Sequence, residues 1–217
     1  MPVGMEGVDV EDVSRLRRCV RAISMQAMAV DFPEVEGHPN RLPFQGCLTV
    51  VDEASDRAPN GSRGHRVILS RDAAREALPS LLGMAVDYKA GWDGHNARQK
   101  CGIITAAHLE PKGEGKRLLV SGYLFARDFP EFGGGGRCRE SARVEAGAGL
   151  PKDAAMGMSY ELADAHVEDM RAPVWRLTRA TFTGAAILLR EKAAYRGTSF
   201  RVGRSGGQGL ASGRLQG

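Results

Sequence analysis

AAMGMSYEL, residues 154–162, is the stretch of this sequence that carries the most information about its fold. It sets one serine, Ser159, among small and apolar residues and ends in a Tyr–Glu pair. Small residues around a hydroxyl are typical of a tightly packed extended segment that holds the serine on a defined face. A second small and apolar run, FTGAAILL, follows at residues 182–189. The two runs predict two strands, the first of which carries the serine.

A histidine upstream of this serine lies in a polar segment that is bracketed by glycines. This histidine, His95, leads into the apolar run of residues 102–105. A histidine on a loop and a serine on a later strand can form a nucleophile with its general base. Three other histidines lie in a linker or in strands, where a structural role is the stronger interpretation: His38, His65 and His108. Ser159 and His95 are therefore the candidate pair.

Two common enzyme motifs do not occur in the sequence. The serine lies in Gly-Met-Ser-Tyr-Glu rather than in the G-x-S-x-G elbow of the α/β-hydrolases. The four glycines at 133–136 lack the lysine and the strand-to-helix context of a phosphate-binding loop. The residues alone therefore predict a mostly β domain with a Ser/His pair.

Length and composition predict one sizeable domain with a hydrophobic core, together with tails. The chain has 217 residues, of which 42% are hydrophobic, and no apolar run approaches the roughly 18 residues of a membrane span. Its first residues, MPVGMEGVDVEDV, lack the basic-then-apolar order of a signal peptide. The four cysteines are scattered without ligand-like spacing, which favours reduced thiols in a cytoplasmic protein. We expect no cofactor, no metal site and no membrane partner.

The charge is concentrated near the end of the chain. Net charge is +4, and residues 198–217 contain three arginines and no acid. No aromatic residue besides Phe200 is interleaved with these arginines. This pattern predicts a flexible basic tail and no specific nucleic-acid partner.

Three parts are predicted along the chain. Residues 1–41 form a helix (8–30) and a proline-rich linker, residues 42–195 the folded body, and residues 196–217 a disordered basic tail rich in glycine and serine. Within the body the pattern predicts a helix that is capped by Ser70 and ends at Leu78. It also predicts strands at 44–51, 65–69, 84–88, 101–109, 117–125 and 174–183, a turn at 164–170 and a short closing helix at 188–195.

The order of these elements resembles that of the tailed-phage prohead (capsid-maturation) serine proteases, distant relatives of the herpesvirus assemblins. The matching segments are FQGCL at 44–48, the histidine loop and glycine–isoleucine strand at 95–104, residues 118–125, Gly-Met-Ser at 157–159, and residues 175–195. The resemblance covers roughly residues 42–195 and implies an α+β fold. Its core would be mostly antiparallel and β-barrel-like with a few flanking helices, as in the herpesvirus proteases.

The resemblance also implies a function. Ser159 would be the nucleophile and His95 the general base of a serine endopeptidase. Such an enzyme cuts scaffold or capsid polypeptides during prohead maturation, through an acyl-enzyme. The substrates and partners would be those polypeptides, with self-association or shell assembly. The location would be the cytoplasm of the bacterial host, inside immature phage capsids.

The third catalytic residue is the point at which this chain departs from the family. The family often places an acid or a histidine on the closing strand, whereas residues 177–183 here contain neither. Thr181 or Thr183 could orient His95 instead, or a residue of the charged stretch could fold back to it: Asp164, His166, Glu168 or Asp169. Arg190 is a candidate for anchoring an oxyanion-binding water.

Two other classes of function stay open. One is a catalytically silent scaffold or shell-assembly protein on the same fold, which a large separation of histidine and serine would favour. The other is a small β-barrel binding module, which a basic groove with exposed aromatic residues would favour.

Overall fold

The computed structural model describes residues 37–110, 117–132 and 155–203, together with residues 30, 33 and 35. The helix predicted at 8–30 lies outside the described residues except for Val30. The backbone N–H of Val30 donates to the carbonyl of Thr105 at 2.8 Å. The predicted basic tail from residue 204 onward also lies outside.

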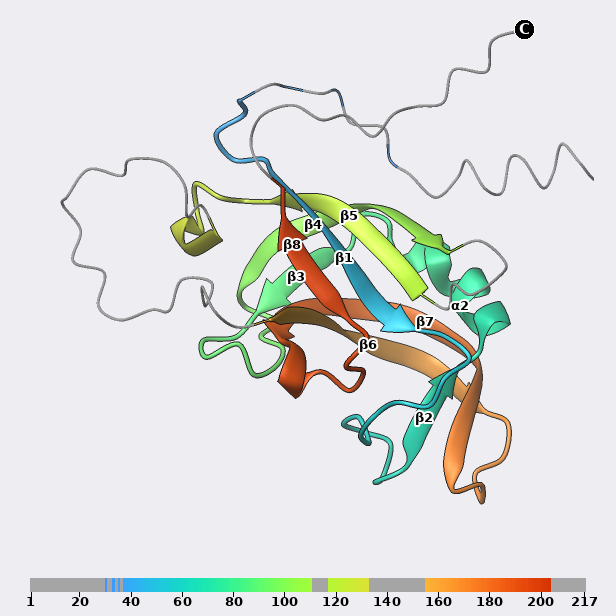
Figure 1. Cartoon of the computed structure of the whole chain (residues 1–217). Coiled ribbons are helices and arrows are strands. Elements are labelled where there is room, and N and C mark those ends of the chain that lie inside the picture. The colour runs from blue at the N-terminus through green and yellow to red at the C-terminus, as the bar shows by residue number, and fades with distance from the viewer. Residues whose placement is uncertain are drawn as a thin grey trace, which may run out of the picture.

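The described chain is an α+β fold built on one mixed sheet (Figure 1). Its strands follow the order β2-β7-β3-β4-β5-β1-β8, and β6 pairs with β7. The strands are β1 (Leu42–Val50), β2 (Arg66–Leu69), β3 (Ala85–Tyr88), β4 (Lys100–Leu109), β5 (Arg117–Leu124), β6 (Met156–Val167), β7 (Val174–Leu189) and β8 (Ser199–Val202). The helices are the α-helix α2 (Arg71–Ala77) and the short 3-10 turns Leu78–Leu81, Pro130–Phe132 and Arg190–Lys192.

Strand β7 organises the sheet. One edge of β7 pairs antiparallel with β6 along most of its length. The other edge pairs in parallel with β2 through residues 174–177 and with β3 through residues 185–187. Because β2 and β3 both run parallel to β7, they run in the same direction. Helix α2 lies between them in the chain. The other pairings of the sheet are antiparallel, as expected of a mostly antiparallel core. The barrel-like closure is not found, because the sheet is mixed and open.

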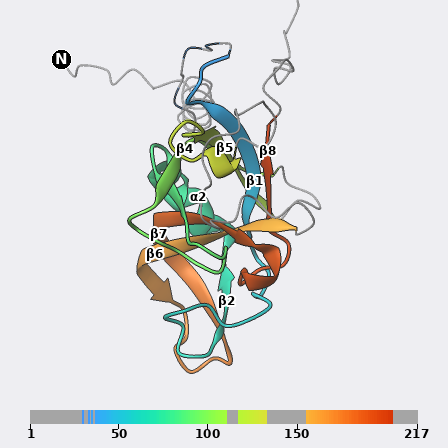
Figure 2. The ribbon, with the colours of Figure 1, turned by 90° about the vertical axis from the view of Figure 1, so that its left-hand side faces the viewer.

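The sheet curls around its core (Figures 1 and 2). In Figure 2, β4, β5, β1 and β8 occupy the upper half of the molecule and β6, β7 and β2 the lower half. Side chains from both halves are fully buried between them, among them Leu48, Ile104, Leu124, Met158 and Ile187. The two halves approach closely at Gly46 of β1, where a Cβ atom would lie 2.7 Å from the Met158 sulfur on β6.

Local sequence signals predict most of the elements correctly. The predicted strands at 44–51, 65–69, 84–88, 101–109 and 117–125 correspond to β1 to β5. Helix α2 begins after Ser70, whose hydroxyl accepts the backbone N–H of Ala73 at 3.2 Å. This is the predicted cap, and it satisfies one of the free donors of the first helical turn.

Three element predictions are wrong in part. Strand β6 continues through Val167, so the turn expected at 164–170 begins only after that residue. Strand β7 continues to Leu189, and the closing helix expected at 188–195 is reduced to the 3-10 turn Arg190–Lys192. Residues 199–202, which belong to the predicted tail, form β8, which pairs with β1. Phe200 of β8 is 6% exposed and lies 5.6 Å from the ring of Phe44, so one buried aromatic residue anchors an otherwise polar segment.

Candidate active site

Ser159 lies in a row of residues that crosses three strands. It is opposite Ala186 of β7 in the register, and Ala186 is in turn opposite Asp87 of β3. Residues opposite each other in a sheet project to the same face, so Ser159 and Asp87 share a face. Two strand spacings separate their backbones by about 10 Å. The methyl group of Ala186 between them leaves room for another side chain above it.

His95 occupies this face. Its Nδ1 lies 3.6 Å from Asp87 Oδ1 and 3.9 Å from Oε1 of Glu161. Glu161 is two residues from Ser159 on β6 and therefore projects to the same side of the sheet. The histidine is only 20% exposed, and both ring nitrogens are buried without a hydrogen-bond partner within the described chain. The sheet and the loop thus bring His95, Asp87 and the face of Ser159 together.

The loop that carries His95 is tied to the sheet at two points. The carbonyl of Trp92 accepts the backbone N–H of Leu189 at 2.8 Å, and the indole of Trp92 is buried against Tyr88. The backbone N–H of Asn96 donates to Asp87 Oδ1 at 3.1 Å. These contacts fix the residues on either side of His95, which explains why a polar loop holds a histidine in a defined place.

Asp87 is a buried carboxylate with several donors around it. It is 1% exposed, and besides the Asn96 N–H it accepts a hydrogen bond from Lys100 Nζ at 2.7 Å. Burial by itself would raise the pKa of Asp87. The nearby His95 ring together with the Lys100 and Asn96 donors outweighs burial and holds the pKa below its ordinary value. The carboxylate is therefore ionised at neutral pH and faces Nδ1 of the histidine.

The contact between His95 and Asp87 is longer than a hydrogen bond. Hydrogen bonds between nitrogen and oxygen span about 2.7–3.2 Å, and the 3.6 Å separation lies beyond this range. Catalytic hydrogen bonds are often long in the absence of substrate and shorten when it binds. A small rotation of the imidazole would close the gap.

Glu161 is a weaker partner for the same nitrogen. Its side chain is 55% exposed, and its Oε2 lies over Gly184, where a Cβ atom would clash with it. An exposed carboxylate is screened by water and is not fixed by further donors in the way that Asp87 is. Asp87 is therefore the stronger of the two acids beside His95.

The residues predicted as a third member lie elsewhere. Within the described chain, the acids paired with His95 are Asp87 and Glu161. Neither is among the predicted third members. Asp164 and His166 are exposed near the far end of β6, and Thr183 is exposed beside a bulge in the β6–β7 register. Thr181 is half-buried opposite Ala163.

The sequence contains one weak indication that Asp87 is a functional residue. It is a lone acid within the apolar strand AVDY, residues 85–88, where an unpaired carboxylate would be costly to bury. Its place on the face of Ser159 depends on β3 pairing with β7, and no local pattern reveals that pairing.

Arg190 begins the 3-10 turn after β7 and lies over the strand that carries the serine. A Cβ atom at Gly157, two residues before Ser159, would be 3.1 Å from the Cα of Arg190. The backbone N–H of Arg190 donates to the carbonyl of Ala155 at 2.9 Å. Its Nε is buried without a partner in the described part of the chain.

A pocket of about 470 Å³ opens at this end of β6 and β7. It lies beside the Ser159–His95 face and contains neither of these residues. The described residues that line it are Arg57, Ala155, Leu189, Arg190, Glu191 and Arg196.

Searches with this chain against protein-family models, curated proteins and solved structures give no significant match. Among the described residues, no group of three or more His, Cys, Asp or Glu side chains is arranged to hold a metal ion. The described helices are all too short or too polar to cross a membrane.

Proposed function

We propose that this protein is a serine endopeptidase in which Ser159 is the nucleophile, His95 the general base and Asp87 the orienting carboxylate. One observation carries the proposal. Ser159 and Asp87 share one face of the sheet on either side of Ala186, and the ring of His95 lies over that face within 3.6 Å of Asp87. A nucleophile, a base and an ionised acid in this order match the logic of the serine-protease triad.

The chemistry follows from the roles of the two ring nitrogens. In the proposed tautomer Nδ1 carries a proton directed at Asp87, and Nε2 accepts the proton of the Ser159 hydroxyl as its oxygen attacks the peptide carbonyl. The imidazolium then protonates the leaving amine, which leaves an acyl-enzyme on Ser159. Water, deprotonated by His95, hydrolyses this ester and restores the free serine. Asp87 stabilises the positive charge on the imidazolium in both steps.

Lys100 has a supporting role in this proposal. It donates to Oδ2 of Asp87, whereas His95 faces Oδ1. The ammonium keeps the carboxylate ionised and fixes its plane, so Oδ1 remains directed at the histidine. Arg190 lies over Gly157, and its buried Nε has no partner among the described residues; it is the proposed support for the oxyanion.

The substrate class comes from the sequence resemblance. The prohead-protease pattern favours scaffold or capsid polypeptides, cut inside an immature phage shell in the cytoplasm of the bacterial host. A stacking surface for single-stranded nucleic acid is less well supported. The exposed large hydrophobic side chains of the described residues are Val30, Val35 and Met170, and none is aromatic.

A serine-reactive phosphonate probe tests the proposal without knowledge of the substrate. The full chain should be labelled covalently at Ser159, as located by peptide mass spectrometry. Ser159→Ala and His95→Ala should both abolish labelling, because nucleophile and base act as one unit. Ser121→Ala on β5 is a matched control, since Ser121 is also a half-buried serine in a strand of this sheet. Unchanged labelling of Ser159→Ala would reject the proposal in favour of a silent scaffold protein.

A further inference from the structure

The pocket beside the Ser159–His95 face is strongly basic. Among the described residues that line it, three are arginines, Arg57, Arg190 and Arg196, and one is an acid, Glu191. That acid is exposed and lies 4.0 Å from Lys192, which offsets its charge. The described lining therefore has a net positive charge that an anion would neutralise.

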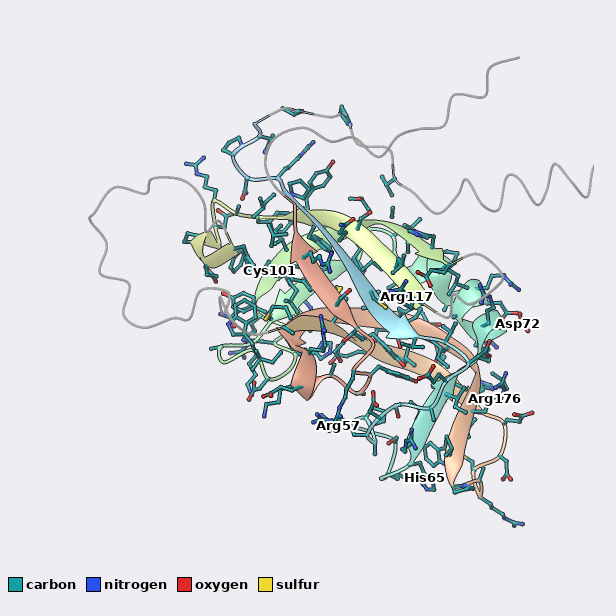
Figure 3. The ribbon with its side chains drawn as sticks, viewed as in Figure 1. Arg57, His65, Asp72, Cys101, Arg117 and Arg176 are labelled. Carbon is teal, nitrogen blue, oxygen red and sulfur yellow. The ribbon has the colours of Figure 1, made fainter. Side chains whose placement is uncertain are left out.

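The arginines are held by a fixed framework. The carbonyl of Ala194 accepts the backbone N–H groups of Asp56 and Arg57, and a carboxylate oxygen of Asp56 accepts the backbone N–H of Arg196 at 2.6 Å. The Arg57 guanidinium donates to the carbonyl of Glu191. Figure 3 shows Arg57 on the loop between β1 and β2, beneath the segment that follows β7. The loop and the segment are thus joined around the pocket.

Within the described chain, no carboxylate forms an ion pair with any of the three guanidinium groups. Arg57 donates to a main-chain carbonyl, and the Nε of Arg190 is buried without a partner. A guanidinium fork binds carboxylates and phosphates with two parallel hydrogen bonds, and it does so most strongly where water is partly excluded. The chemistry of the pocket is therefore that of a site for a planar or tetrahedral oxyanion.

The position of the pocket relative to Ser159 identifies the source of that anion. Ser159 is opposite Ala186, whereas the pocket begins at Leu189, three residues further along β7. Three residues of extended chain span about 10 Å. An extended polypeptide with its scissile bond at Ser159 could therefore place a side chain two to four residues away in the pocket.

We infer that the pocket is a specificity subsite that binds an acidic side chain of the substrate polypeptide, with Arg196 as its principal carboxylate ligand. The inference rests on the proposed endopeptidase function for the position of the scissile bond. It assigns a substrate class that the Ser159–His95–Asp87 arrangement leaves open, namely segments with Glu or Asp a few residues from the cleavage point.

The binding test uses the full chain carrying Ser159→Ala, so that its outcome does not depend on catalysis. Fluorescent short peptides from a randomised library, with one position fixed as Glu or as Gln, are titrated and followed by anisotropy. We expect the Glu peptides to bind about tenfold more tightly than their Gln counterparts. Adding Arg196→Gln should remove this preference, whereas Arg179→Gln, an exposed arginine of β7 outside the pocket, should leave it intact.

The competing outcomes are separable. Equal affinity for Glu and Gln peptides, or a preference that survives Arg196→Gln, would overturn the inference. So would displacement of both peptide types by inorganic phosphate without any Glu preference, since the pocket would then be a free-anion site. A third outcome is possible, in which the Glu preference depends on Arg196 but the wild-type chain fails to react with the phosphonate probe. That result would support the acidic subsite and reject the endopeptidase function.

Discussion

Asp87 is the residue whose role depends most on tertiary structure. It sits in a short apolar strand, is 1% exposed, and faces a histidine that comes from the following loop. If it orients His95, Asp87→Asn should leave the fold intact and lower the rate of cleavage about 10²- to 10⁴-fold, because the amide favours the wrong tautomer. Glu161→Gln should cost far less, since Glu161 is 55% exposed. The measurement is kcat on a cleaved polypeptide, with melting temperatures recorded for both variants.

The outcome for these two acids discriminates between them. If Glu161→Gln is inactive and Asp87→Asn is active, the residue that orients His95 is Glu161 on β6. If both variants cleave about as fast as wild type, His95 works without a carboxylate.

The ionisation of Asp87 also predicts how stability depends on pH. Its pKa in the folded chain is held below the ordinary value of 3.8 by its donors. A carboxylate with a depressed pKa stabilises the folded state above its unfolded pKa, and this contribution is lost as pH falls through the folded value. The difference in free energy of unfolding between wild type and Asp87→Asn should therefore be constant near neutral pH and shrink below about pH 4. Urea unfolding across that range provides the measurement, and a pH-independent difference would contradict the ion pair.

At the scale of elements, the close approach of β1 to β6 is a testable packing feature. Gly46→Ala would put a Cβ 2.7 Å from the sulfur of Met158 and 2.5 Å from the carbonyl of Ser199. We expect a loss of roughly 1–3 kcal/mol in the free energy of unfolding, since overpacking of a dense core forces side chains and backbone to shift. Gly94→Ala is the control, because a Cβ there meets no atom within 4 Å. Equal melting temperatures for the two variants would show that the halves of the sheet are less tightly packed.

The elements also show what the sequence could and could not predict. Apolar runs and turn residues predict β1 to β5, and a serine before a helical pattern predicts α2, because these signals are local. Strand β8 was not predicted, because a single buried phenylalanine anchors it and most of its other residues are polar. The approach of Asp87 to Ser159 could not be predicted for a different reason. It requires β3 to pair in parallel with the end of β7, and such pairing depends on the arrangement of the whole sheet. The catalytic roles of Ser159 and His95 remain predictions, although strand β6 and the loop after β3 bring the two residues to one face of the sheet.

At the scale of the whole molecule, the folded body extends beyond residue 195 to include β8. Truncation after Gly203 keeps β8, whereas truncation after Gly197 removes it along with Phe200. We expect the first truncation to leave the melting temperature nearly unchanged and the second to lower stability by at least about 2 kcal/mol, the order expected for exposing one large buried side chain. Thermal unfolding of the two truncated chains measures this. Similar stability of both would mean that β8 contributes little to the fold.

The two-sided pairing of β7 has a consequence for how this sequence can change over generations. Leu177 is fixed opposite Leu69 of β2, and Ala186 is fixed opposite Asp87 of β3. A one-residue insertion or deletion between them would turn every later side chain of β7 to the other face and separate Ser159 from Asp87. Distant relatives with the same chemistry should therefore keep this interval of nine residues (186 − 177 = 9) even where the amino acids differ, and should vary in length between strands instead. A search for that fixed interval, combined with an acid eight residues before a histidine (95 − 87 = 8), should find relatives that overall sequence similarity misses.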